Sequence, residues 1–313
     1  MKSGEIALSD DLNALTSTAD LMLDASWYHA IELKPGVYTP GFKFKNIAMT
    51  RKMLKGCEVE GATCLDVGTM DGLISVLLSR RGANRVFACD RYDRRAHLDI
   101  VARMLGVTIN YLGGVSLADV RRMAPSLVGD PFDIIVFSGV LYHMYDPMNG
   151  LGLIRSMVRP GGIVVIETQA IKSKEMVSYF NARGEIAEDC HNYWNMSVEL
   201  LDYLLRYFRL KPLDCCYFNV SDRIVRISVP CEAISTSLAD NGDTFMCVPG
   251  RDDDADYPTW GSSNGKPLAY SPSNPAALVR RQSGAVNLYE TLVKTPPAPY
   301  EERDLALALE DRF

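Results

Sequence analysis

The sequence predicts an α/β fold in which a mainly parallel sheet is covered by helices on both faces. Between residues 60 and 230, short apolar runs alternate with stretches that have helical periodicity. The apolar runs are nearly continuous, which is typical of strands buried on both faces. The last two runs are joined by the short link 220–222, which suits an antiparallel hairpin that closes the sheet.

The elements follow one another in a regular order that begins with a strand at residues 62–67. Glycines that follow the first two helices, Gly82 and Gly106, are typical helix stops. The further expected strands are residues 85–90, 107–112, 132–138, 163–168, 213–219 and 223–229. The expected helices are residues 73–81, 94–105, 117–123, 147–158 and 197–208, with a terminal helix at 301–309.

The change of pattern at both ends predicts three parts. Residues 1–59 form an N-terminal segment or lid, residues 60–231 form the α/β domain, and residues 232–313 form a C-terminal extension rich in turn residues. The extension is expected either to cap the active site or to make a subunit contact, so a homodimer is one option.

Composition excludes several classes of protein. The chain has 313 residues, 47% of them hydrophobic, and a formal net charge of -6, so it lacks the charge of a general nucleic-acid binder. We find no signal peptide and no run long enough to span a bilayer, and we therefore expect a cytoplasmic protein. The eight cysteines contain no Cys-x-x-Cys pair, which predicts reduced, mostly buried thiols and no metal site.

A glycine loop follows the first strand, as Asp66-x-Gly68-x-x-x-Gly72. A dinucleotide site would need a glycine at position 70 to admit a pyrophosphate, but the residue there is Met70. Taken alone, the loop favours a glycine turn without a ligand. Acidic residues in it would repel phosphates but would suit a ligand that carries an amino group.

Asp90 ends the second strand and strengthens the ligand interpretation. A carboxylate at this place can accept hydrogen bonds from both hydroxyls of a ribose. Its alternative role is to cap the helix that follows. The neighbouring Arg91, Arg94 and Arg95 could form an anion site or simply the solvated start of that helix.

The residues at the end of the fourth strand resemble those of a known protein family. The run Gly139-Val140-Leu141-Tyr142-His143 and the loop Val158-Arg159-Pro160-Gly161-Gly162 resemble segments of class I S-adenosylmethionine-dependent methyltransferases. Together with Ile166-Glu167-Thr168 and the segment 192–197, they look nearest to the group of tRNA 5-oxyacetic-acid uridine methyltransferases. The resemblance implies a Rossmann-like seven-stranded methyltransferase sheet with an N-terminal lid and a C-terminal extension.

The loop and the resemblance together assign the cofactor site. S-adenosyl-L-methionine, which becomes S-adenosyl-L-homocysteine, would lie against the loop, with the adenine near residues 115–117 and the methyl-donor end near His143. The expected cofactor-binding residues are Asp66, Gly68, Thr69, Asp71, Gly72, Asp90, Arg91, Val115, Ser116, Leu117, Ser138, Gly139 and His143.

Candidate catalytic and acceptor-binding residues lie near the same segments. His29 and Glu32 would share a face if the N-terminal segment is helical, and that helix could be a catalytic lid or simply pack on the core. Tyr142 and His143 sit at the carboxyl edge of the sheet, whereas His97 is expected at the surface. Aromatic residues that could wall a sulfonium, or merely pack in the core, are Trp27, Tyr28, Tyr38, Tyr193 and Trp194.

Three functions remain open at this point. The first is methylation of a small, amino-acid-like metabolite at a thioether, amine or hydroxyl group. The second is modification of a tRNA wobble uridine, but residues 4–33 contain no lysine or arginine, which argues against nucleic acid. The third is binding of the cofactor, or of a partner, without catalysis.

Overall fold

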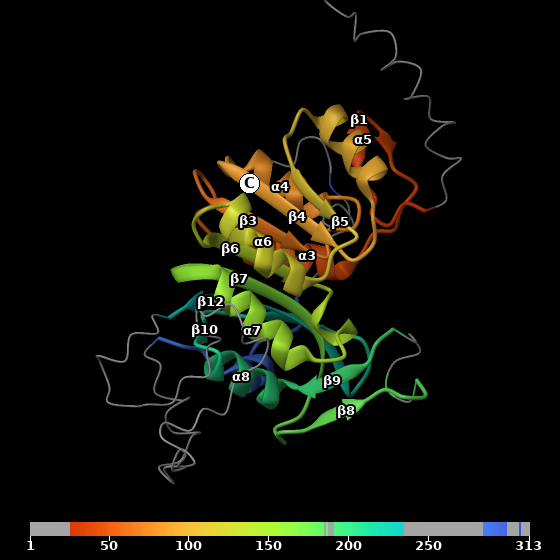
Figure 1. Cartoon of the computed structure of the whole chain (residues 1–313). Helices are drawn as coiled ribbons and strands as arrows, with labels where there is room; N and C mark the ends of the chain where they lie inside the picture. The colour runs from red at the N-terminus through yellow and green to blue at the C-terminus, as the bar shows by residue number, and fades with distance from the viewer. Residues whose placement is uncertain (1–25, 185, 187–190, 235–283, 299–306, 308–313) are drawn as a thin grey trace, which may run out of the picture.

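The computed structural model describes residues 26–184, 186, 191–234, 284–298 and 307, and shows one twisted sheet with helices on both faces (Figure 1). The order of the strands is β5-β4-β3-β6-β7-β12-β10. Neighbours from β5 to β7 are parallel, while β12 runs antiparallel to β7. The predicted α/β fold with a closing hairpin is therefore confirmed.

The strands of this sheet lie close to the predicted runs. The five parallel strands are β3 (Thr63–Val67), β4 (Arg85–Asp90), β5 (Asn110–Gly113), β6 (Phe132–Ser138) and β7 (Val158–Ile171). The closing strands are β10 (Leu210–Pro212), β11 (Cys216–Asn219) and β12 (Ile224–Ala233), with β10 and β11 both antiparallel to β12. The hairpin β8 (Ser178–Phe180) and β9 (Trp194–Ser197) was not predicted; β9 extends the sheet beside the end of β7.

The helices begin and end where local sequence directs them. Ser116 and Asp119 form a reciprocal capping box at the start of α6, and Ser197 caps α8. Gly106 adopts a left-handed conformation at the end of α5. The helices are α3 (Lys45–Lys55), α4 (Leu73–Arg80), α5 (Arg95–Leu105), α6 (Leu117–Leu127), the 3-10 turn η1 (Leu141–His143), α7 (Pro147–Met157), α8 (Val198–Tyr207) and α10 (Leu288–Lys294).

Two hydrophobic clusters fill the two sides of the sheet. Along β6, Ile135 and Phe137 belong to the cluster that contains residues of α7 and α8, whereas Ile134 and Val136 belong to the cluster that contains residues of α3 and α4. Successive side chains of a strand point to opposite faces, so a strand covered on both faces is apolar at nearly every position. This explains the continuous apolar runs.

The described part of the N-terminal segment before α3, residues 26–44, is not helical. It is extended, with the short hairpin β1 (Glu32–Lys34) and β2 (Val37–Tyr38) and an isolated bridge between His29 and Phe42. In an extended chain, residues three apart point to opposite faces, so His29 and Glu32 do not share a face as predicted.

The described part of the C-terminal extension packs on the domain. Leu288 and Leu292 of α10 are buried in the cluster that includes α8. The backbone N–H of Leu307 donates to the carbonyl of Ala30, which brings the chain back to the N-terminal segment. The predicted terminal helix at 301–309 lies outside the described residues apart from Leu307. The three-part division of the chain stays a prediction.

Thiols and membrane segments were also predicted from composition. Within the described ranges, six cysteines are free and buried: Cys57, Cys64, Cys89, Cys215, Cys216 and Cys231. The other two, Cys190 and Cys247, lie outside the described residues. A search of the described helices finds none with the length and apolar character needed to cross a bilayer.

Candidate functional site

The candidate site lies at the carboxyl ends of β3, β4 and β6. The strand order reverses between β3 and β6, because the chain builds outward from β3 to β5 and then returns to the other side of β3. Open α/β sheets bind ligands in the crevice at such a switch point. The loop 68–72 leaves β3 at this place.

The two loop glycines hold backbone shapes that other residues rarely adopt. Gly68 has φ +75°, and a Cβ built on it would lie 2.4 Å from Val140 Cγ2, so the loops after β3 and β6 can meet only at a glycine. Gly72 has φ +87° and precedes α4. Met70 between them also has a positive φ of 49°, a strained value for a residue with a side chain.

Asp66 stabilises the loop from inside. One oxygen of its carboxylate, Oδ2, accepts hydrogen bonds from the hydroxyls of Thr69 and Ser75, both at 2.7 Å. Burial raises the pKa of Asp66 to about 6, although these two hydrogen bonds act in the opposite direction. Asp66 and Thr69 therefore shape the loop, and their predicted contact with a cofactor remains a proposal.

Asp90 occupies the position that the sequence predicted for a ribose-binding carboxylate. Its two oxygens accept the backbone N–H groups of Met70 and Tyr92, each at 2.9 Å. A carboxylate offers about four lone-pair sites, so two remain for a diol. The backbone N–H of Val115 donates to the Asp90 carbonyl at 3.1 Å, which places residues 115–117 beside this carboxylate.

These features fit S-adenosylmethionine better than a dinucleotide. Met70 stands where a pyrophosphate would need a glycine, and the carboxylates of Asp66 and Asp90 would oppose phosphate charge. When bound, the cofactor supplies a methyl group already activated on a sulfonium. The structure leaves Asp90 free to hold the ribose and residues 115–117 free to frame the adenine.

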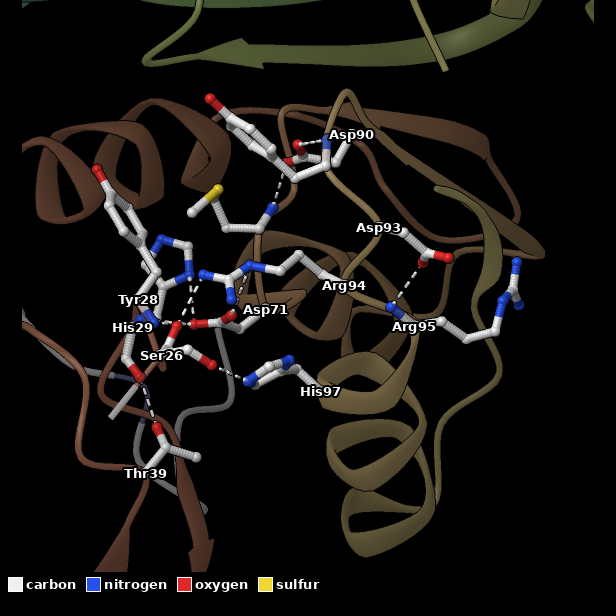
Figure 2. A network of polar contacts seen from close by, with 12 residues as sticks. Ser26, Tyr28, His29, Thr39, Asp71, Asp90, Asp93, Arg94, Arg95 and His97 are labelled. Atoms are coloured by element: carbon white, nitrogen blue, oxygen red, sulfur yellow. Dashed lines mark hydrogen bonds and ion pairs between the residues drawn. The ribbon is translucent and has the colours of Figure 1, made fainter. Parts of the chain in front are cut away.

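Asp71 connects the loop to the N-terminal segment (Figure 2). Its Oδ2 accepts the backbone N–H of Tyr28 at 2.5 Å and that of His29 at 2.7 Å. Arg94 Nε lies 3.9 Å from the other oxygen, and the Arg94 guanidinium donates to the carbonyl of Ser26. The side chain is fully buried and faces the N-terminal segment, so its observed role is to anchor that segment.

The two histidines of this region are buried. Burial, with a smaller effect from Arg94, lowers the pKa of His29 to about 3, so the imidazole is neutral at physiological pH. His97 was expected at the surface, but it is only 9% exposed, and its Nε2 lies 3.0 Å from the Ser26 hydroxyl. That expectation was wrong because the N-terminal segment covers α5.

The remaining predicted cofactor residues have distinct surroundings. Arg91 is exposed and stacks over the ring of Tyr92. The Ser116 side chain is engaged in the capping box of α6. The Ser138 hydroxyl lies 2.9 Å from that of Thr50, which ties α3 to the end of β6.

A buried charged pair beside Gly139 was missed by the sequence reasoning. Glu167 on β7 makes two hydrogen bonds with Arg226 on β12, at 2.7 and 2.8 Å. Burial lowers the pKa of Arg226, but Glu167 and then Tyr142 raise it more strongly, so the net shift is upward. Two opposite charges inside neighbouring apolar strands were the signal that could have revealed this pair.

Tyr142 contacts the Arg226 member of this charged pair. Its hydroxyl accepts a hydrogen bond from Arg226 Nη1 at 2.9 Å, and the guanidinium stacks over its ring. Burial raises the pKa of Tyr142 to about 12, opposed by Arg226 and supported by Glu167 and by the Tyr28 phenol. The Tyr28 ring stacks on that of Phe44, with ring centroids 4.7 Å apart.

The other predicted aromatic residues divide into two places. Tyr193 stacks on Tyr145 with ring centroids 4.2 Å apart, and Trp194 Nε1 donates to the Tyr145 carbonyl. The ring nitrogen Nδ1 of His143 lies 2.6 Å from the carbonyl of His191, next to this cluster. Trp27, by contrast, is buried with its ring edge against His97, and Tyr38 is exposed on β2. These two residues are therefore not part of the aromatic cluster of Tyr145, Tyr193 and Trp194.

Comparison with known proteins agrees with this arrangement. Residues 45–213, more than half of the chain, match the family described as "Methyltransferase domain". A ubiquinone biosynthesis O-methyltransferase of Rhizobium leguminosarum bv. trifolii is 29% identical over 205 residues, which cover 60% of this chain and 75% of that protein. One of Cereibacter sphaeroides is 30% identical over 110 residues, which cover 35% of this chain and 42% of that protein, less than half of its length.

A solved structure supports the fold. The N-terminal domain of EvdMO1, crystallised with S-adenosylhomocysteine bound, aligns over 74% of this chain and 100% of that domain, with a TM-score of 0.51 at 13% identity. A likeness at this identity speaks for the fold alone. The class I resemblance is confirmed, while the relatives above are named for ubiquinone biosynthesis rather than for tRNA. The chain belongs to the methyltransferase domain family, whose methyl donor is S-adenosylmethionine.

Proposed function

We propose that this protein is a methyltransferase that uses S-adenosylmethionine to methylate a small molecule. The observation that carries the proposal is the position of Asp90. Its carboxylate ends β4 at the switch point, receives the Met70 N–H of the glycine loop, and lies beside the backbone of Val115. One side of the site can therefore hold the ribose, while the end of β6 remains for the acceptor.

The chain's own residues do most of the remaining work. Methyl transfer from a sulfonium needs alignment and exclusion of water more than it needs a strong base. The N-terminal segment, anchored on Asp71, lies over the loop and can exclude water. His29 is buried and its pKa is about 3, so it would act as a neutral part of this cover rather than as a cationic acid.

A small acceptor is favoured over tRNA. The relatives reported above are named as O-methyltransferases of ubiquinone biosynthesis, which supports an acceptor of metabolite size. The net charge of -6 is unfavourable for a phosphate backbone. The tRNA alternative predicts a salt-sensitive shift of tRNA in a gel at low ionic strength.

Calorimetry and methyl transfer test the proposal in turn. We expect adenosylhomocysteine and adenosylmethionine to bind the full chain with 1:1 stoichiometry. Labelled methyl groups should then pass to a member of a panel of phenols, amines and thioethers, and not to tRNA. Transfer to tRNA alone would replace the small-molecule acceptor, and absence of binding by either cofactor form would leave only a non-catalytic role.

A further inference from the structure

Gly139 opens on a small polar space at the end of β6. A Cβ built on this glycine would have three polar atoms as its nearest neighbours, each 3.9 Å away: Asn46 Nδ2, Glu167 Oε2 and the Tyr142 hydroxyl oxygen. Gly139 has φ +73°, which a residue with a side chain rarely adopts, so the space stays open. We call it the Gly139 recess.

Strand pairing and a helix contact place the residues of the recess next to one another. Glu167 on β7 lies opposite Ser138, the last residue of β6. Arg226 on β12 lies opposite Gln169, so it is the diagonal neighbour of Glu167 on the same face of the sheet. Asn46 comes from the first turn of α3, which the contact between the hydroxyls of Thr50 and Ser138 fastens above β6.

Two donors that face the recess have no acceptor among the residues that the structure describes. Arg226 has only donors, so the Tyr142 hydroxyl accepts from it and must direct its own proton elsewhere. Within the part of the chain that the structure describes, nothing accepts that proton. Asn46 Nδ2 uses one of its two N–H groups on Glu167 Oε2, at 3.5 Å, and the second is left over.

The recess also has one unused hydrogen-bond acceptor, on the Glu167 carboxylate. The Glu167 carboxylate accepts two hydrogen bonds from Arg226 and a longer one from Asn46. A carboxylate can accept about four, so one lone pair is left. Arg226 neutralises the charge of Glu167, so the recess as a whole favours an uncharged group.

Two donors and one acceptor match a hydroxyl group. A hydroxyl has two lone pairs and one proton, so it can accept from Tyr142 and Asn46 while it donates to Glu167. An ammonium could not accept from either donor, and neither a carboxylate nor a thioether has a proton to give to Glu167. Resting on the function proposed above, we infer that the Gly139 recess binds the acceptor through its hydroxyl group, with Asn46, Tyr142 and Glu167 as ligands and Arg226 as a positioning residue.

The surface next to the recess suits an aromatic or apolar remainder of the acceptor. The backbone N–H of Tyr193 donates to the carbonyl of Tyr142, which joins the recess to the ring pair of Tyr193 and Tyr145. Tyr145 is 73% exposed and Phe180, tilted against Trp194, is 47% exposed. A phenol is therefore the simplest probe of both features.

The test measures binding rather than turnover. With the full chain saturated by adenosylhomocysteine, we would compare phenol with anisole, in which the hydroxyl proton is replaced by methyl, by ligand-observed NMR titration. We expect phenol to bind more tightly than anisole in the unaltered protein. Tyr142→Phe and Asn46→Ala should each weaken phenol binding about three- to tenfold, the effect of one hydrogen bond, because each removes a donor to the phenol oxygen.

Tyr179→Phe is the matched control, because it removes the same hydroxyl from a half-exposed ring on β8 and should change neither titration. Asn46 is partly exposed on a helix, so Asn46→Ala tests the recess even where Tyr142→Phe lowers stability. Equal binding of phenol and anisole, or no phenol binding, overturns the inference. Weaker adenosylhomocysteine binding in these variants assigns the recess to the cofactor instead. Failure of adenosylhomocysteine to bind the unaltered protein refutes the proposed function itself.

Discussion

The Asp71 carboxylate accepts the backbone N–H of His29 at 2.7 Å, and this bond joins two segments that are 42 residues apart in the chain. The same oxygen accepts the N–H of Tyr28 (Figure 2). Asp71 directly precedes Gly72, the residue before α4, so the glycine loop and the N-terminal cover are one connected unit. Order in one of them therefore supports order in the other.

Replacing Asp71 should loosen this unit. In Asp71→Ala the N–H groups of Tyr28 and His29 lose their acceptor in a buried place, at a cost of about 2–4 kcal/mol in the free energy of unfolding. Asp71→Asn keeps one carbonyl oxygen and should lose less. Urea unfolding of the three proteins checks this order, and equal stability of Asp71→Ala and the unaltered chain would contradict the anchoring role.

His29 should make the protein sensitive to acid. Its pKa is about 3 in the folded state, against 6.5 as the ordinary value, so below pH 6.5 the unfolded chain binds a proton that the folded chain excludes. Stability is thus present above pH 6.5 and is lost as the pH falls toward 3. The loss between pH 6 and pH 5 should be about 1 kcal/mol and should disappear in His29→Phe.

Asp66 acts in the opposite sense over part of this range, since its pKa is raised to about 6. Its contribution to stability is largest at low pH and declines as the pH rises through 6. Both proteins of the His29 comparison keep Asp66, so the difference between their pH profiles isolates His29. Parallel profiles would show that His29 is protonated in the folded state.

Asp90 should be required for cofactor binding. Loss of its carboxylate in Asp90→Ala should weaken adenosylhomocysteine binding about tenfold to a hundredfold, because two hydrogen bonds from the ribose lose a charged acceptor. Asp93→Ala is the control: Asp93 Oδ1 accepts the N–H of Arg95 at the start of α5, in the same loop. Calorimetry should show little change there, and similar losses in both variants would argue for a general effect on the loop.

Replacing Glu167 alone should lower the free energy of unfolding more than replacing both Glu167 and Arg226. Glu167→Gln leaves the Arg226 charge buried without its partner, which should cost about 3–5 kcal/mol. Adding Arg226→Met in the same chain should recover much of that loss, because no buried charge remains. Thermal unfolding of the single and double variants measures this coupling, and additive losses would show that the two residues do not depend on each other.

Local sequence was sufficient for the parts of the site that are contiguous. The strand, the glycine loop and α4 follow one another directly, and the acid at the end of β4 was predicted by its place after an apolar run. The expected helix at residues 94–105 corresponds to α5 (Arg95–Leu105), because the left-handed Gly106 is a local stop signal. These elements depend on periodicity and glycine conformations, which neighbours in the chain control.

Other features depended on contacts between distant residues. His29 and Glu32 would share a face on a helix, but backbone hydrogen bonds from residues 29–32 to Asp71, Phe42 and Leu307 hold this stretch extended. His97 was expected at the surface, and the same segment buries it. Backbone hydrogen bonds to a buried partner outweigh the small energies of helix propensity.

The sequence by itself determined the α/β methyltransferase fold and predicted a cofactor loop at residues 66–72, because those signals are local. Only the tertiary structure decided what lies beside Gly139. Asn46, Tyr142, Glu167 and Arg226 come from α3, η1, β7 and β12, and the register of β7 with β6 and β12 places the two charges on one face. Register is a property of paired strands, so no single run of residues could reveal it.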